Sequence, residues 1–273
     1  MIRACVMGYP VAHSLSPKLH GFWLRKYGID GEYTLKEVKP EQLKETLGML
    51  VEQGFAGCNL TTPLKETALS LMDELDESCK AAGAVNTVVI RKGRKMGYNS
   101  DGFGFMESLK AQYPKWDGAC VVILGAGGAA RGIIAALGKA GARHFVLINR
   151  TREKAEKITK DFKLGNAAIV DWQDRAAALT NATLLVNCSS LGMTGGLPLE
   201  LDLSALPKTA AVCDIVYRPL ITPLLAGAKL RGNPAVEGLP MLLHQGRLGF
   251  RQWFGVDPAV TEELYGEMTT GEI

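Results

Sequence analysis

The sequence lacks the features of a disulfide-bonded, metal-binding or nucleic-acid-binding protein. Its six cysteines are scattered over 273 residues without a CxxC pair, and they show no paired spacing with the four histidines. We therefore expect reduced thiols and no metal site. The net charge is only +3 and no long basic run is present, which argues against nucleic acid as the main partner.

Long uninterrupted apolar runs are also scarce. Residues 1–7 contain no charged segment leading into a long apolar core, so we expect no signal peptide. The one membrane-like window, residues 119–137, is rich in glycine and interrupted by Arg131. We expect a cytoplasmic protein with no membrane partner, long enough for one large domain or two ordinary ones.

A glycine turn between an apolar run and a helix organises the chain. Residues 121–124 are typical of a buried parallel strand. Gly125 then permits a tight turn, Gly127 lets a pyrophosphate approach the backbone, and the small Ala130 allows helix and strand to pack closely. A second apolar strand at 144–148 completes a βαβ unit. The pattern predicts a dinucleotide site; the alternative is an apolar helix with incidental glycines.

The residues after the second strand indicate which dinucleotide binds. An NAD-binding protein usually has an aspartate or glutamate there, about 20 residues past the turn. This chain has Asn149, Arg150, Thr151 and Arg152 instead. Two guanidinium groups can pair with a 2′-phosphate, and no carboxylate is present to repel it. We predict NADP; the alternative is that both arginines are solvated residues at the start of a helix.

Two serines precede a helix that we expect to begin at Pro17. Ser16 is expected to be its N-cap, which leaves the hydroxyl of Ser14 free. Two hydroxyl groups beside the backbone amides of a helix N-terminus suit a carboxylate ligand. Helix capping alone remains the simpler interpretation of this segment.

A second polar group follows the strand expected at 54–60. Asn59 and Thr61 can form directed hydrogen bonds with a polyol. Lys65 falls one turn into the next helix, over the carboxyl end of the strand, where ligands of open α/β sheets bind. The alternative for Lys65 is an ordinary solvated charge.

A predicted hairpin of residues 87–91 and 96–98 attaches a reversed strand to this mostly parallel sheet. Asp101 follows it closely. This carboxylate is a candidate site residue, although it could simply cap a helix at 103–112 or belong to a turn.

From 119 to 238 strands and helices alternate, which predicts a six-stranded doubly wound sheet. Two further helices, at 239–254 and 258–268, have no strand to cross over to, so we expect them to cover the first domain. The predicted fold class is α/β with two domains. One is an open, mostly parallel α/β substrate domain formed by 1–102 with 239–273, and the other is a doubly wound Rossmann domain formed by 103–238.

Nine short motifs occur in the order that they have in the shikimate dehydrogenase family. They lie at residues 9–17, 57–65, 83–87, 99–102, 125–131, 149–151, 187–193, 214–217 and 238–245. The chain therefore resembles that family from residue 8 to about residue 254. The resemblance implies an enzyme that reduces 3-dehydroshikimate to shikimate with NADPH, with its active site in a cleft between two domains and a homodimer as one possible assembly.

The resemblance also implies roles for individual residues. Lys65 and Asp101 would flank the reacting oxygen, and Tyr217 would lie near the substrate carboxylate. The other implied substrate ligands are Ser14, Ser16, Asn59, Thr61, Asn86 and Gln245. The implied cofactor ligands are Gly125, Ala126, Gly127, Gly128, Ala129, Asn149, Arg150, Thr151, Arg152, Ser189, Met193, Ile215 and Gly238. One departure from the family pattern is Ser100, which replaces a threonine and keeps a hydroxyl.

The chemistry can be argued without the resemblance. A hydride added to a ketone carbon leaves negative charge on the oxygen, which the ammonium group of Lys65 can stabilise and protonate. Asp101 would orient that lysine. Two rivals stay open: a quinate/shikimate dehydrogenase that accepts NAD, and a non-catalytic ligand sensor on the same fold. Arg150 and Arg152 argue against the cofactor of the first, and retention of Lys65 with Asp101 argues against the second.

Overall fold

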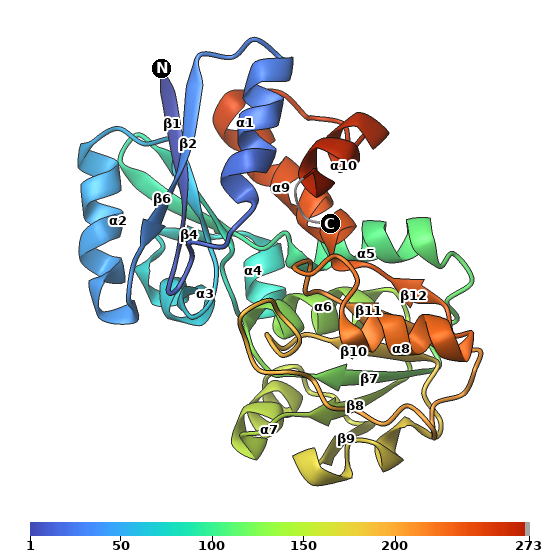
Figure 1. Cartoon of the computed structure of the whole chain (residues 1–273). Coiled ribbons are helices and arrows are strands. Elements are labelled where there is room, and N and C mark those ends of the chain that lie inside the picture. Colours follow the sequence, from blue (N-terminus) through green and yellow to red (C-terminus); the bar gives the residue numbers. More distant parts are fainter. Residues whose placement is uncertain (271–273) are drawn as a thin grey trace. The chain divides into compact units, whose positions relative to one another are not determined.

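The computed structural model describes residues 1–270, which form two compact units. Unit 1 comprises Met1–Gly104 with Leu242–Thr270, and unit 2 comprises Phe105–Met241. Each unit contains a six-stranded sheet (Figure 1). Within residues 1–270, no helix combines the length and the apolar character that crossing a bilayer requires.

The sheet of unit 1 is mostly parallel, with strand order β2-β1-β3-β5-β6-β4. Strand β1 pairs in parallel with β2 and β3, whereas β5 runs antiparallel to both β3 and β6. This confirms the reversed hairpin predicted from the sequence; the short β4 was not predicted. The strands are β1 (Ile2–Gly8), β2 (Gly31–Glu37), β3 (Gly57–Leu60), β4 (Glu74–Leu75), β5 (Thr87–Arg91) and β6 (Arg94–Tyr98).

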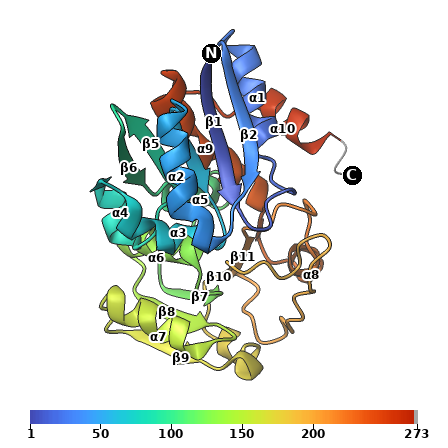
Figure 2. The ribbon, with the colours of Figure 1, turned by 90° about the vertical axis from the view of Figure 1, so that its left-hand side faces the viewer.

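Helices cover both faces of this sheet. In Figures 1 and 2, α2 lies on one face, and α1, α9 and α10 lie on the other. Leu43 and Leu47 of α2 are buried in a cluster with Cys5 and Cys58 of the strands, because successive strand residues alternate between the two faces. The helices of this unit are α1 (Ser16–Lys26), α2 (Leu43–Glu52), α3 (Leu64–Thr67), α4 (Glu77–Ala82), α9 (Gly238–Phe254), which begins in unit 2, and α10 (Glu262–Thr269), with 3-10 turns η1 (Pro40–Gln42) and η2 (Ala68–Leu71).

The indole of Trp253 connects α9 to the sheet by a hydrogen bond. Trp253 Nε1 donates a hydrogen bond of 3.0 Å to the carbonyl oxygen of Val88 in β5. This approach requires Gly57, whose φ is +154° and whose absent Cβ would lie 2.0 Å from Val88 O and 2.3 Å from Trp253 Nε1. The glycine therefore makes room for the contact between helix and strand.

The sheet of unit 2 has the order β12-β11-β10-β7-β8-β9, and every neighbouring pair is parallel. This confirms the six-stranded doubly wound sheet; its sixth strand, β9, was not located from the sequence. The strands are β7 (Cys120–Leu124), β8 (His144–Ile148), β9 (Ala167–Val170), β10 (Leu184–Asn187), β11 (Ala211–Asp214) and β12 (Ala235–Val236). The helices are α5 (Asp101–Gln112), which begins in unit 1, α6 (Gly128–Lys139), α7 (Arg152–Asp161) and α8 (Pro223–Arg231), with 3-10 turns η3 (Trp172–Asp174) and η4 (Ala177–Leu179).

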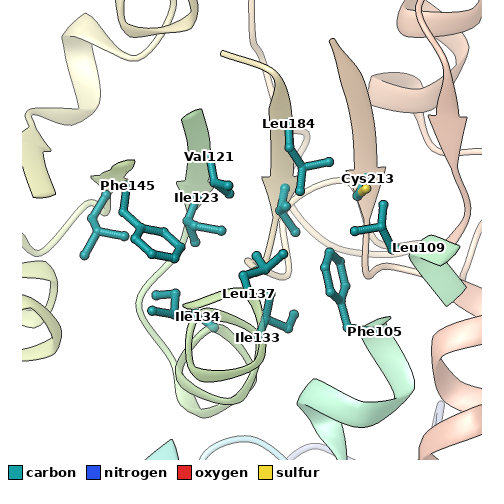
Figure 3. Close-up of a cluster of buried hydrophobic side chains, with 14 of the residues drawn as sticks. Phe105, Leu109, Val121, Ile123, Ile133, Ile134, Leu137, Phe145, Leu184 and Cys213 are labelled. Atoms are coloured by element: carbon teal, nitrogen blue, oxygen red, sulfur yellow. The ribbon is translucent and has the colours of Figure 1, made fainter. Parts of the chain in front are cut away.

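Alternate residues of these strands supply two separate apolar cores. Val121 and Ile123 of β7 face α6, and Figure 3 shows its side chains Ile133 and Leu137 pointing toward them. Val122 and Leu124 belong to the opposite core with Leu224 and Leu225 of α8. A sheet buried on both faces explains why its strands are continuous apolar runs in the sequence.

Candidate active site

An ion pair joins α3 to α5 in unit 1. Lys65 Nζ lies 2.6 Å from Asp101 Oδ2, and the two side chains are 12 % and 4 % exposed. The backbone carbonyl of Lys65 also accepts a 2.8 Å hydrogen bond from Val85 N, which ties α3 to the segment before β5. Lys65 is therefore fixed by contacts with the protein, and it is not the ordinary solvated charge that was its alternative interpretation.

The carboxamide of Asn86 connects this ion pair to two further side chains. Asn86 Nδ2 lies 3.0 Å from each of Asp101 Oδ1, Ser100 Oγ and Gln245 Oε1. Its Oδ1 accepts from the backbone N–H of Ser100 at 2.9 Å. Lys65, Asp101, Asn86 and Gln245, four of the residues expected at the site, thus lie together although α9 comes from the far end of the sequence.

Asp101 does not serve as a helix cap. Helix α5 begins at Asp101 itself, and the side-chain oxygen of Asn99 accepts from the Asp101 N–H at 3.1 Å. Both carboxylate oxygens of Asp101 are instead directed at Lys65 and Asn86. The carboxylate is free of capping because Asn99 performs that task.

The capping of α1 also differs from the expectation. The helix begins at Ser16, Leu15 is in the N-cap position, and Ser14 Oγ accepts from the Ser16 N–H at 3.3 Å. The prediction that Ser16 is the N-cap and Ser14 is free was therefore wrong. The reason is that Leu15 already has helical backbone angles, which shifts the start of the helix and brings the hydroxyl of Ser14 over the first turn.

Asn59 has a different environment from the one expected for a polyol ligand. Its Oδ1 accepts from Tyr33 Oη at 2.6 Å, and its Nδ2 donates to Asn86 O at 3.1 Å and to Thr87 Oγ1 at 3.0 Å. Both amide hydrogens are thus directed at atoms of the protein. Thr61, at the end of β3, is held by a backbone bond from its N–H to Met7 O.

Tyr33 and Thr87 were not assigned a role from the sequence. Alternation along β2 places Tyr33 on the buried face of its strand, where its ring stacks on His20 with centroids 3.9 Å apart. Burial without a charged partner lowers the pKa of His20 to about 3. The ring of Tyr33 therefore packs against an uncharged imidazole.

In unit 2 the expected cofactor residues gather at one edge of the sheet. The carboxyl ends of β7, β8, β10 and β11 are in register, because Leu124 pairs with Ile148 and Asn187, and Asn187 pairs with Asp214. Strand order reverses between β7 and β10, and such a switch point is where open α/β sheets bind ligands. The loops that follow these strands carry Gly125, Asn149, Ser189, Met193, Ile215 and Tyr217.

The loops at this edge approach one another closely. Gly125 has φ +104°, and its absent Cβ would lie 3.0 Å from Ser189 N. Gly238, at the start of α9, would place a Cβ 2.6 Å from the carbonyl oxygens of Asp214 and Val216. Both glycines are needed because backbone occupies the space of a side chain.

The N-terminus of α6 fits a pyrophosphate. The helix begins at Gly128 with Gly127 as its N-cap, and no side chain caps its first N–H groups. A Cβ on Gly127 would meet nothing within 4 Å, so the space beside this N-cap residue is open. Uncapped amides and the positive end of the helix dipole favour an anion here.

The two arginines after β8 are not equivalent. Arg152 donates to Asp171 Oδ1 at 2.7 Å and to Glu156 Oε1 at 3.0 Å, and these hydrogen bonds raise its pKa. Arg150 is exposed, and its side chain has no hydrogen bond or ion pair within residues 1–270. Asn149 Nδ2 donates to Thr151 O at 2.7 Å and so shapes the turn between them. Arg150 is thus the arginine available to pair with a 2′-phosphate, because Arg152 is already paired with two carboxylates.

A buried carboxyl group holds two of the loops at the same edge. Asp214 Oδ1 accepts from Asn187 Nδ2 and Val216 N, and its Oδ2 accepts from Thr222 Oγ1. Burial raises the pKa of Asp214 from 3.8 to about 6, against the opposing effect of these hydrogen bonds. Asn187 Oδ1 in turn accepts from both the N–H and the hydroxyl of Ser189.

In the part of the chain that the structure describes, no group of three histidine, cysteine or acidic side chains is arranged to hold a metal ion. The six cysteines are free thiols, as predicted, and burial raises the pKa of Cys5 and Cys79 to about 12.

Fold and site together define a class of protein. A doubly wound sheet with a glycine turn, an uncapped helix N-terminus and a basic loop is the architecture of dinucleotide-dependent α/β dehydrogenases. A lysine–carboxylate pair surrounded by amides and hydroxyls supplies the acid and base groups that such enzymes need for a polar substrate.

Comparisons with known proteins give the same result at a finer level. Residues 6–88 match the family model of the shikimate dehydrogenase substrate binding domain, residues 107–192 match shikimate / quinate 5-dehydrogenase, and residues 238–262 match the shikimate 5′-dehydrogenase C-terminal domain. The shikimate dehydrogenase (NADP(+)) of Paramagnetospirillum magneticum is 49% identical over 264 residues, which cover 96% of this chain and 95% of that protein.

Two solved structures are similar over almost the whole chain. Shikimate 5-dehydrogenase from Thermus thermophilus, in complex with NADP(H) and shikimate, has a TM-score of 0.85 at 38% identity, and the match covers 98% of this chain and 97% of that one. Quinate dehydrogenase from Corynebacterium glutamicum, in complex with NAD, has a TM-score of 0.87 at 28% identity, and the match covers 98% of each chain. The chain belongs to the shikimate dehydrogenase family, which confirms the resemblance seen in its sequence.

Proposed function

We propose that the protein reduces 3-dehydroshikimate to shikimate with NADPH. The observation that carries the proposal is the Lys65–Asp101 ion pair at 2.6 Å, held by Asn86 in the same unit as Gln245 and the hydroxyls of Ser14, Ser16 and Thr61. NADPH, when bound, supplies the hydride. The loop residues of unit 2 that would hold it are those at the carboxyl edge of the sheet, with α6 facing the pyrophosphate and Arg150 facing the 2′-phosphate.

Lys65 provides the proton for this reaction. Its ammonium group stabilises the negative charge that develops on the carbonyl oxygen of the substrate and donates a proton from Nζ to that oxygen. Asp101 Oδ2 orients the ammonium group, and its Oδ1 is kept in place by Asn86. In the opposite direction Lys65 accepts the proton of the shikimate hydroxyl. The hydroxyls of Ser14, Ser16 and Thr61 would supply further substrate ligands in the same unit.

The relatives support both the substrate and the cofactor. The curated relative from P. magneticum is named for NADP(+), and the T. thermophilus structure contains NADP(H) and shikimate. The quinate dehydrogenase contains NAD instead. An exposed Arg150 with no acidic partner among the described residues favours the first group, because the 2′-phosphate distinguishes NADP from NAD.

Initial rates with shikimate and with quinate, each measured with NADP and with NAD, test the proposal. The absorbance of the reduced nicotinamide reports every reaction. We expect shikimate with NADP to dominate. Comparable or higher rates with quinate and NAD would move the protein to the quinate/shikimate dehydrogenases. No turnover in any of the four combinations, with shikimate still bound in calorimetry, would instead indicate a ligand sensor.

A further inference from the structure

The carboxamide of Asn86 has two orientations of the same shape, and only one is compatible with its neighbours. With Nδ2 toward Asp101, Asn86 donates to the carboxylate and to Gln245 Oε1, both at 3.0 Å. If the group were turned over, its carbonyl oxygen would face the Asp101 carboxylate and its amide hydrogens would face the backbone N–H of Ser100. The orientation of one amide therefore decides whether Asp101 is held or repelled.

We propose that the hydroxyl of Thr87, together with the backbone N–H of Ser100, fixes that orientation and that Thr87 is a positioning residue for the reaction proposed above. Thr87 Oγ1 lies 3.0 Å from Asn86 Oδ1 and 3.0 Å from Asn59 Nδ2. A hydroxyl has a single hydrogen. Since the amide nitrogen of Asn59 can only donate, Thr87 accepts from Asn59 and gives its hydrogen to Asn86 Oδ1.

The orientation of Asn59 is fixed by a backbone carbonyl, a group that cannot reverse its role in a hydrogen bond. Asn59 Nδ2 also lies 3.1 Å from the backbone carbonyl of Asn86, which can only accept, and Tyr33 Oη donates to the other end of the same amide at 2.6 Å. Hydrogen bonds therefore run from Tyr33 to Asn59 Oδ1, from Asn59 Nδ2 to Thr87, from Thr87 to Asn86 Oδ1 and from Asn86 Nδ2 to Asp101. This set of hydrogen bonds is called the relay below.

Burial makes the relay effective. Tyr33, Asn59, Thr87, Asn86 and Asp101 are all buried, so water does not readily replace a lost partner. Removing the Thr87 hydroxyl leaves Asn59 Nδ2 and Asn86 Oδ1 each with one partner fewer. The backbone N–H of Ser100 then remains as the chief donor that keeps Asn86 Oδ1 in place.

Thr87→Val tests the inference, because valine has nearly the shape of threonine and suits strand β5. We expect kcat with shikimate to fall about 10- to 100-fold, consistent with a catalytic pair that is present but less well held. The KM for shikimate should rise, while the KM for NADP stays unchanged. Thr87→Ser, which retains the hydroxyl, should restore most of the activity. Thr34→Val is the matched control: Thr34 lies on β2 of the same sheet, and its side chain makes no hydrogen bond among the described residues.

Wild-type kinetics in Thr87→Val, or a loss that Thr87→Ser does not restore, would overturn the inference. Tyr33→Phe provides a second variant if Thr87→Val fails to fold; a smaller decrease in kcat with an unchanged KM for NADP is expected, and no decrease counts against the relay.

A readout that does not need turnover separates this inference from the proposed function. The side-chain amide protons of Asn86, assigned in NMR spectra by their loss in Asn86→Asp, should exchange slowly with solvent in the wild type and faster in Thr87→Val. If the wild type does not oxidise shikimate, the proposed function fails while this difference still tests the relay. Equal exchange in both proteins would refute the relay itself.

Discussion

Lys65 Nζ and Asp101 Oδ2 lie 2.6 Å apart although 36 residues separate them in the sequence. Each comes from the first turn of its helix, α3 or α5, and the two charges compensate one another in a largely buried position. Because a charge removed from such a pair leaves its partner uncompensated, both residues are sensitive positions for activity and for stability.

Lys65→Ala should abolish most turnover without abolishing substrate binding. Loss of a positioned proton donor lowers kcat by about 10²- to 10⁴-fold, whereas calorimetry should show shikimate binding within about tenfold of the wild type. Lys80→Ala is the control, since Lys80 pairs with Glu77 at 2.6 Å on the exposed surface of the same unit and should be dispensable. A Lys65→Ala enzyme with wild-type kcat would exclude Lys65 as the proton donor.

Arg150 and Arg152 should contribute unequally to the choice of cofactor. Loss of a charge-assisted bond to a phosphate costs about 1.5–3 kcal/mol, so Arg150→Ala should raise the KM for NADP by about 10- to 100-fold and leave the KM for NAD unchanged. Arg152→Ala should have a smaller effect, because Asp171 and Glu156 already engage this side chain. Steady-state kinetics with both cofactors measure the difference. Equal effects of the two substitutions would contradict the assignment.

Gly57 and Gly48 should respond in opposite directions to alanine. At Gly57 the added Cβ would meet the carbonyl oxygen of Val88 and the indole of Trp253 in a backbone conformation unfavourable for alanine. We expect a loss of about 3 kcal/mol or more. Gly48 lies inside α2, where a Cβ meets nothing within 4 Å, so Gly48→Ala should stabilise by about 0.5–1 kcal/mol. Thermal unfolding of both variants beside the wild type measures the two effects.

Asp214 should make stability depend on pH with a sign opposite to that of most carboxylates. Its folded-state pKa is about 6 against an ordinary value of 3.8, so the folded state binds the proton more tightly than the unfolded state between these values. Stability from this group is therefore fully present below pH 3.8 and decreases as pH rises to about 6, by about 3 kcal/mol.

Asp214→Asn isolates this contribution. The amide keeps the shape of the side chain and can donate to Thr222 Oγ1, but it does not titrate. Denaturant unfolding of both proteins across this pH range should show the difference between their free energies of unfolding changing by the amount given above. Carboxylates with lowered pKa values, such as Asp73 and Asp161, contribute with the opposite sign and cancel in the comparison. A constant difference would show that Asp214 has an ordinary pKa.

Local sequence was sufficient for much of this molecule. The apolar run at 121–124, the glycine turn and the next apolar strand predicted the βαβ unit, because strand burial and tight turns depend on neighbouring residues. The order of motifs predicted the family, and the hairpin after Asn86 was predicted from its turn. The sequence also identified Lys65 and Asp101 as candidates, although each had an ordinary alternative.

Tertiary structure decided which alternative holds and what each polar group does. Asp101 faces Lys65, 36 positions earlier in the sequence, because the hydrogen bond from Val85 N to Lys65 O holds α3 beside the segment before β5. Arg152 is paired with Asp171, a residue from another segment of the chain. The relay through Asn59 and Thr87 has no local signal, since its donors and acceptors come from strands β2, β3 and β5. Periodicity tells which face of a strand is buried, but the atom that a buried amide contacts depends on how distant segments pack.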